Sequence, residues 1–468
     1  MEALYANTTG YSNVAIGNEA LRNNTTGHHL VAIGDSALYN QSANSLYFNT
    51  AIGSKTLFSN TTGIENTATG QNALYSNVTG SQNTANGSFS LFSNTLGKFN
   101  TATGTTSLYT NQTGNGNTAN GFDALYANTS GSYNTAIGNA TLTYNTTGYY
   151  NTGIGTFSLN NNTGGYSNTA IGVAALYLNT AGHNMVAVGD SALFNQSVNA
   201  NGWYYNTAVG SKALYKNTIG AGNTALGDES LMHNISGLDN AAGGASALYT
   251  NSTGNANTAF GSHSLFLNTE GNGNTAFGYA SLYSNSTGYS NVAIGIGALF
   301  SNKKGNNSVA MGDSALYNFK GNDGRNTAIG SKALFANTSG VNNTATGIQA
   351  LYNNSSGYSN AAYGGYALAA NTEGWYNTAN GIFALYHNKT GNNNTATGEE
   401  ALKNNTEGSD NIATGFQSSF SNTSGNENIA VGVKALYYNK TLNNLVAIGD
   451  SALYLISSGA GRSTAGVM

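Results

Sequence analysis

The sequence predicts an all-β fold, a single parallel β-solenoid or β-roll of about 27 coils of 17 residues with two short strands in each coil. Three observations lead to this prediction: a repeat of fixed length, two strand-like runs in each repeat, and columns of small or apolar residues that recur in step. No break in the pattern marks a domain boundary. Residues 1–468 are therefore expected to form one continuous repeat domain without evident capping repeats.

The repeat length is read from the glycine of the motif N-T-A-x-G, which recurs at Gly17, Gly34, Gly53 and onward to Gly449. Almost every step is 17 residues, and the three longer steps end at Gly53, Gly210 and Gly330. Each repeat holds one run of the type "NTAI" and one of the type "ALY", separated by Gly and Asn. These separators favour turns, and they leave no room for a long amphipathic helix.

Two columns of the repeat are predicted to form the core. The Ala of the first run, as in Ala15 and Ala32, accepts only Ala or Gly, which indicates a close approach between the two sides of the coil. The Leu of the second run, as in Leu21, Leu38 and Leu57, is almost as strict. Burial of each Leu is worth about 1.5–3 kcal/mol.

An aromatic column follows that Leu, and its members include Tyr5, Tyr39, Phe58, Tyr75 and Tyr126. Neighbouring side chains of a strand point to opposite faces. Constraint on successive positions of the second run therefore predicts a strand covered on both sides, and the simplest cover is another copy of the chain. The alternative is a ladder of stacked rings on an exposed face, stabilised by neighbouring rings.

Two Asn columns complete the repeat, one at its opening and one after the aromatic residue. Asn tolerates left-handed backbone angles, and stacked Asn side chains form amide ladders. The second column also creates N-x-[ST] sequons at Asn7, Asn60 and Asn388. Because this corner is expected to be exposed, glycosylation there is an alternative that the sequence leaves open.

Four irregular coils contain "GDSAL", with Asp35, Asp190, Asp313 and Asp450 after the glycine. Each loses Asn from both columns, and three precede the insertions, which indicates loops that bulge from the coil. "GDS" resembles a serine hydrolase motif, but no His stands in a fixed relation to it, as a catalytic triad requires. We interpret each Asp as a turn residue. We expect no catalytic, cofactor or metal site, and no enzymatic activity.

Charge and hydropathy exclude further classes of function. The net charge is −4 and only 7% of residues are charged, so the basic surface that nucleic-acid binding requires is missing. No apolar run is long enough for a transmembrane segment. The N-terminus lacks the pattern of a signal peptide, and the absence of Cys leaves the redox compartment open.

The two ends of the sequence fit each other. Residues 461–468 followed by residues 1–10 recreate the internal stretch of residues 324–340 to within one residue. We therefore expect a head-to-tail seam that includes Glu2, Leu4, Ala465 and Met468. Uncapped ends expose strand edges, and a contact of this type that does not close generates a filament. The rival reading is a fragment of a longer array.

The stretches Ser308–Leu316 ("SVAMGDSAL"), Asn291–Gly295 ("NVAIG") and Asn134–Gly138 ("NTAIG") resemble the YadA-like head repeats of trimeric autotransporter adhesins, and similar units occur in phage tail fibres. The resemblance covers nearly the whole chain. It implies a left-handed parallel β-roll in a tight homotrimer that binds host matrix or surfaces. The family unit is shorter than 17 residues, and no neck, stalk or membrane anchor follows here.

The favoured function is a structural, self-assembling extracellular or cell-surface fibre or adhesive rod. Its expected partners are further copies of itself, in a lateral oligomer that the resemblance suggests is a trimer and in end-to-end stacks, and surface or matrix glycans or proteins. The alternative is a trimeric adhesin head or a phage tail-fibre segment. An ice-binding surface is the third reading, because Thr recurs along the first run, at Thr50, Thr67, Thr84 and Thr101.

Overall fold

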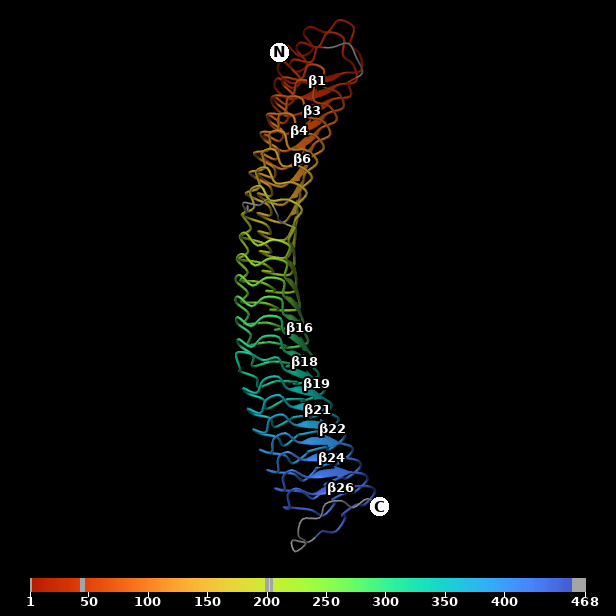
Figure 1. The fold of residues 1–468 in the computed structure, drawn as a ribbon. Helices are drawn as coiled ribbons and strands as arrows, with labels where there is room; N and C mark the ends of the chain where they lie inside the picture. The colour runs from red at the N-terminus through yellow and green to blue at the C-terminus, as the bar shows by residue number, and fades with distance from the viewer. Residues whose placement is uncertain (1, 43–46, 198–201, 203–204, 457–468) are drawn as a thin grey trace. The chain divides into compact units, whose positions relative to one another are not determined.

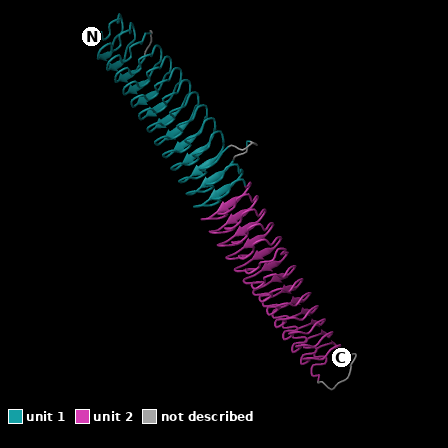
Figure 2. Ribbon diagram, turned by 90° about the vertical axis from the view of Figure 1, so that its left-hand side faces the viewer, with its two compact units in different colours: residues 1–236 teal, residues 237–468 magenta. Residues whose placement is uncertain are grey.

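The structure is a computed structural model that describes residues 2–42, 47–197, 202 and 205–456. These residues form a parallel β-solenoid with 26 short strands, and they contain no helix. The predicted all-β class and the repeat spacing near 17 residues are confirmed. The chain divides into two compact units, residues 1–236 and 237–468, coloured separately in Figure 2. The prediction of one continuous domain without capping repeats stays a prediction.

Each strand of the first unit is the three-residue run that ends before the repeat glycine. The strands are β1 (Val14–Ile16), β2 (Val31–Ile33), β3 (Thr50–Ile52), β4 (Thr67–Thr69), β5 (Thr84–Asn86), β6 (Thr101–Thr103), β7 (Thr118–Asn120), β8 (Thr135–Ile137), β9 (Thr152–Ile154), β10 (Thr169–Ile171), β11 (Val186–Val188), β12 (Thr207–Val209) and β13 (Thr224–Leu226).

The second unit has the same arrangement. Its strands are β14 (Ala241–Gly243), β15 (Thr258–Phe260), β16 (Thr275–Phe277), β17 (Val292–Ile294), β18 (Val309–Met311), β19 (Thr327–Ile329), β20 (Thr344–Thr346), β21 (Ala361–Tyr363), β22 (Thr378–Asn380), β23 (Thr395–Thr397), β24 (Ile412–Thr414), β25 (Ile429–Val431) and β26 (Val446–Ile448).

Within each unit, consecutive strands lie side by side and pair in parallel without slippage (Figure 1). Thr67 pairs with Thr84, and Thr84 with Thr101, so each column of the sequence becomes a column of the sheet. The rest of the coil also bonds to the next coil: the N–H of Leu74 donates to the carbonyl of Ser90 over 3.0 Å. Hydrogen bonds from turn to turn therefore bind successive coils all around the circuit.

The second run of the repeat is not a strand, and the prediction of two strands per coil is wrong. The run Ala73–Tyr75 lies in a series of turns, and Leu74 has a φ of +53°. A left-handed residue turns the chain within one position, whereas an extended strand would send neighbouring side chains to opposite faces. Ala73 and Leu74 both point inward and are fully buried. The same left-handed Leu recurs along both units.

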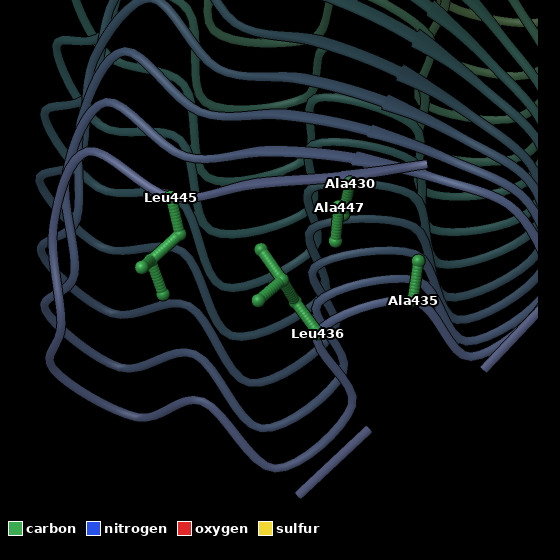
Figure 3. Packing of buried hydrophobic residues seen from close by; sticks show 5 residues of the cluster. All are labelled: Ala430, Ala435, Leu436, Leu445 and Ala447. Carbon is green, nitrogen blue, oxygen red and sulfur yellow. The ribbon is translucent and has the colours of Figure 1, made fainter. Parts of the chain in front are cut away.

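The interior of each coil has an apolar part and a polar part. In the coil from Thr67 to Asn83, Ala68, Ala73 and Leu74 are fully buried, and so are Asn77 and Asn83. Figure 3 shows the apolar part near the end of the second unit, where Leu436 and Leu445 point into the coil beside the strand residues Ala430 and Ala447. The predicted core residues Ala32, Leu21, Leu38 and Leu57 are fully buried, while Ala15 in the first strand is half-buried.

Candidate functional site

The polar part of the interior consists of two columns of stacked Asn side chains. The first Asn ladder is the column that opens the repeat. Asn100 donates from Nδ2 to the carbonyl of Gly114 over 2.9 Å, and its Oδ1 accepts from the backbone N–H of Asn117 over 3.0 Å. The pattern repeats from coil to coil, so the amides satisfy the backbone groups of the corner and one another.

The second Asn ladder is the column after the aromatic residue. Asn94 donates from Nδ2 to Oδ1 of Asn77 over 2.7 Å and to the carbonyl of Gly97 over 3.1 Å. Its own Oδ1 accepts from Nδ2 of Asn111 over 2.8 Å. Both Nδ2 hydrogens are thus used inside the coil.

The expectation of an exposed corner at the second Asn column is wrong, and the buried ladder argues against the alternative of glycosylation that the sequence left open. Asn60 and Asn388 are fully buried, and the Nδ2 atom that would carry a glycan donates two hydrogen bonds in each. Asn7, in the first coil, is half-buried, and its Nδ2 donates to the carbonyl of Gly10. The sequence contained a signal for this burial: Phe319 occupies the second Asn column in one irregular coil, and an apolar residue of this size belongs inside.

The irregular coils are places where the two Asn ladders change partners. Leu30 interrupts the first ladder, and the longer side chain of Gln41 replaces Asn in the second. Oε1 of Gln41 then accepts from Asn60 over 2.7 Å and from Asn49 over 3.3 Å, joining both ladders. Gln196 does the same after Met185, accepting from Asn217 and Asn206.

The four Asp residues of the irregular coils lie on the surface. Asp35, Asp190, Asp313 and Asp450 are all exposed. Asp35 accepts from Ser36 and Asn18, and Asp190 from Ser191, consistent with the turn role. Of the insertions, residues 43–46, 198–201 and 203–204 lie outside the described residues. The one at residues 320–324 is described, and Phe319 beside it fills the coil interior.

The aromatic column forms stacks of parallel rings along each unit. In the first unit the stack runs through Tyr39, Phe58, Tyr75, Phe92, Tyr109 and Tyr126, with centroid distances of 5.0–5.2 Å. The ring faces cover one another and the rings are half-buried. The constraint on this column is therefore explained within one chain. The inference of a covering second copy loses its premise, because the run is not a strand.

Cationic side chains fill breaks in the aromatic stack. Arg22 lies between Tyr5 and Tyr39, 5.7 Å from each ring centroid, while Tyr5 itself is 72% exposed. In the second unit Lys403 takes the aromatic position and contacts Phe420. The pKa of Glu400 is lowered mainly by a hydrogen bond from Lys403 and to a smaller extent by one from Gln417. Oε1 of Glu400 lies 2.5 Å from Nζ of Lys403. These contacts continue the stack where a ring is missing.

We expect Tyr109→Ala to loosen the coils around it. The substitution removes two stacked ring contacts, with Phe92 and Tyr126, each worth about 0.5–1.5 kcal/mol, so local opening should become about 1–3 kcal/mol easier. Amide hydrogen exchange of residues 92–126 measures this directly. The control is Tyr144→Ala, since Tyr144 is 54% exposed and contacts no ring in the described chain. Equal effects of both variants would contradict a stabilising role for the stack.

The outward-facing residues of the strands share one property, which is the absence of charge. In each strand the middle residue points inward, and the first and third residues point outward. None of the 26 strands contains Asp, Glu, Lys, Arg or His, although the whole chain has 15 Lys and Arg and 19 Asp and Glu. The outward positions of the strands in each unit are therefore occupied by uncharged residues alone, some apolar and some polar.

The third strand position divides this face into blocks. We define the apolar block of the first unit as the third residues of β8–β13, which are Ile137, Ile154, Ile171, Val188, Val209 and Leu226. A similar block in the second unit comprises Phe260, Phe277, Ile294, Met311 and Ile329. Their exposed fractions lie between 36% and 41% where the residue is exposed. We define the polar block as the outward residues of β4–β7, which are Thr67, Thr69, Thr84, Asn86, Thr101, Thr103, Thr118 and Asn120.

The expected head-to-tail seam is described only on one side. The Glu2 carboxylate lies 2.5 Å from Nε of Arg22, and the N–H of Leu4 donates to the carbonyl of Ala20. Ala465 and Met468 lie outside the described residues. The seam stays a prediction.

No chemistry-bearing cluster accompanies these surfaces. In the described residues there is no group of three or more His, Asp or Glu side chains placed to hold a metal ion. The search for membrane-spanning helices of sufficient length and hydropathy, made over the same residues, found none. No protein-family model, curated protein or solved structure matches this chain. The resemblance to YadA-like heads therefore stays an expectation.

Proposed function

We propose that this chain is a structural, self-assembling protein of the cell surface or extracellular space, a fibre or adhesive element that acts through its surface and not as an enzyme. The observation that carries the proposal is the uncharged outward face of the strands, with its exposed apolar blocks. The interior of each coil is filled by its own side chains, so the outward ladders are what the chain offers to a partner.

We propose further that the partner of the apolar block is a second copy of the chain. Every copy repeats the same register, with one strand for each coil of about 4.8 Å. Two copies laid face to face therefore bring an apolar side chain of one against the other at every step, and the mismatch does not grow along the stack. The absence of charge avoids the large desolvation penalty of burying an ion in such a contact. The neighbouring polar block limits the relative shifts along the stack at which two copies can bury apolar surface against each other.

This proposal relocates the lateral contact. The sequence placed it on the aromatic column, whose rings are already covered by one another. The apolar block has no such cover within the described chain, and single exposed apolar patches of this kind are where copies associate. End-to-end stacking and the number of copies in a cross-section remain part of the proposal.

We expect the double variant Ile171→Lys with Val209→Lys to lower the mass of the particles in solution to that of one chain. Both residues are 38% exposed, so Lys fits at each without disturbing the interior, but its charge opposes a dry contact. Light scattering after size separation gives the mass, and negative-stain electron microscopy gives the form of the assemblies.

The matched control is Val173→Lys with Leu178→Lys. These residues are equally apolar and exposed, at 52% and 39%, but they lie in turns of the same unit. The control should associate as the unmodified chain does. A single-chain mass for the unmodified protein, or an undiminished mass for the strand variant, would remove the basis of lateral association through the apolar block.

A further inference from the structure

The polar block of the first unit presents a regular array of unused hydrogen-bonding groups. The pairings place Thr67, Thr84, Thr101 and Thr118 in one column. Thr69, Asn86, Thr103 and Asn120 form a second column beside it. All of these residues are exposed except Thr103, which is half-buried.

The hydroxyls of this block differ from other Thr hydroxyls of the chain. At the coil corner, Thr61 and Thr95 donate from Oγ1 to a carbonyl of the next coil, over 3.1 and 3.0 Å. In the polar block, no side chain donates or accepts a hydrogen bond within the described chain. Its hydrogen-bonding capacity is directed entirely to the solvent.

The array is also rigid. Thr is branched at Cβ and has restricted χ1 angles. Each strand is held on both sides by parallel neighbours, and the buried Ala between each outward pair has no side chain that could rearrange. The backbone therefore fixes the positions of the side-chain oxygens, and we expect water bound to them to adopt the same two-dimensional order.

We propose that the polar block of β4–β7 orders water into an ice-like layer and adsorbs to ice. Tetrahedral waters with hydrogen bonds of about 2.75 Å have second neighbours about 4.5 Å apart, which follows from the hydrogen-bond length and the tetrahedral angle. The columns repeat about every 4.8 Å, so the misfit is about 0.3 Å for each coil and about 1 Å over the block. Across the strand there is a single step of about 6.7 Å, so no misfit accumulates in that direction.

The short length of the block and its lack of charge both favour water as the ligand. A face of four strands ends before the misfit reaches half of one lattice step. Charged side chains would bind water in shells that compete with a lattice, and β4–β7 contain none. Two of the four strands, β4 and β6, have the sequence T-A-T, and Asn replaces the second Thr in β5 and β7.

A hydroxyl-bearing polysaccharide surface is the main rival ligand. Proteins commonly hold sugar rings against the open face of an aromatic side chain, and the polar block has no aromatic residue. The rings of Tyr75 and Phe92, in the turn segments of the same coils, stack on each other at 5.2 Å, so their faces are occupied. The polar block itself offers only hydroxyl, methyl and amide groups.

The test is partition of the full chain into slowly grown ice, together with inhibition of ice recrystallisation. We expect the unmodified protein to enter ice, and the double variant Thr84→Lys with Thr101→Lys to lose at least tenfold in both measurements. Thermal unfolding of the variant confirms that the coils remain intact, since both residues are fully on the outside. The strand variant of the apolar block, Ile171→Lys with Val209→Lys, carries the same added charge and should retain ice adsorption.

Two sets of results would overturn the proposal. The first is exclusion of the unmodified chain from ice, or equal partition of the two Lys variants. The second is binding to crystalline cellulose or chitin powder without binding to ice, which would assign the block to polysaccharide. Neither result bears on self-association, because the mass of the particles is measured separately and depends on the apolar block.

Discussion

Gly87→Ala is expected to lower the free energy of local opening in the first unit by about 2–6 kcal/mol, because the added Cβ causes both backbone strain and overpacking. Gly87 follows β5 with a φ of +143°, a conformation that only glycine adopts readily. A Cβ there would lie 2.6 Å from the carbonyl carbon and oxygen of Gly104 in the next coil. Both atoms belong to backbone that is hydrogen-bonded in turn, so neither can move away without disturbing further coils.

Amide hydrogen exchange is the appropriate measurement, because stability in a repeat protein is distributed over neighbouring units and global unfolding need not be two-state. Exchange of residues 70–104 should rise sharply, while that of residues 135–170 should change little. The control is Gly164→Ala, where the nearest atom to an added Cβ is Oγ1 of Thr147 at 3.6 Å. If Gly87→Ala exchanged as slowly as this control, the close stacking of successive glycines would be wrong.

Asn94→Ala should weaken the same region by about 2–6 kcal/mol, since a buried polar group left without a partner costs about 1–3 kcal/mol and each further lost hydrogen bond about 0.5–1.5 kcal/mol. The substitution removes the donor to Oδ1 of Asn77, one of the two side-chain donors to the carbonyl of Gly97, and one of the two acceptors for Nδ2 of Asn111. All three partners remain buried around the cavity that the removed amide leaves.

Replacement of an exposed Asn is the control, because it shows the effect of losing an Asn side chain that lies outside the ladder. Asn139 follows the repeat glycine and its side chain is exposed, so Asn139→Ala should change hydrogen exchange by less than about 0.5 kcal/mol. A weak effect of Asn94→Ala, close to that of Asn139→Ala, would mean that water enters the coil and replaces the ladder.

The sequence predicted the repeat, the parallel pairing and the apolar columns because these depend on periodicity alone. Ala32 and Leu38 recur in step, and stacking of equivalent positions follows from the fixed repeat length. Each of these columns carries its own evidence of burial, since one accepts only Ala or Gly and the other almost only Leu, with Ser419 as the exception. The positions of Leu21, Leu38 and Leu57 in the interior were therefore predictable.

The remaining features depend on backbone angles that residue type does not reveal. Leu74 has a φ of +53°, which is uncommon for a side chain of this shape, so the run around it was expected to be extended. Asn77 and Asn94 are residues that usually lie on surfaces, and their burial follows only when each amide meets an identical amide one coil away. The lateral contact was therefore assigned to the aromatic column, whereas we propose the apolar block.

The coil-to-coil bonding has a consequence for how such a gene changes length. Asn83 and Asn100 occupy equivalent positions, and each side chain bonds to its counterparts in the adjacent coils and to the carbonyl of an equivalent glycine. Duplication or loss of 51 nucleotides between such positions, which is three for each residue of the 17-residue repeat, adds or removes one whole coil and gives every remaining amide a partner of the same kind. Replication slippage can thus lengthen or shorten the protein in steps of about 4.8 Å without a cost to any single coil.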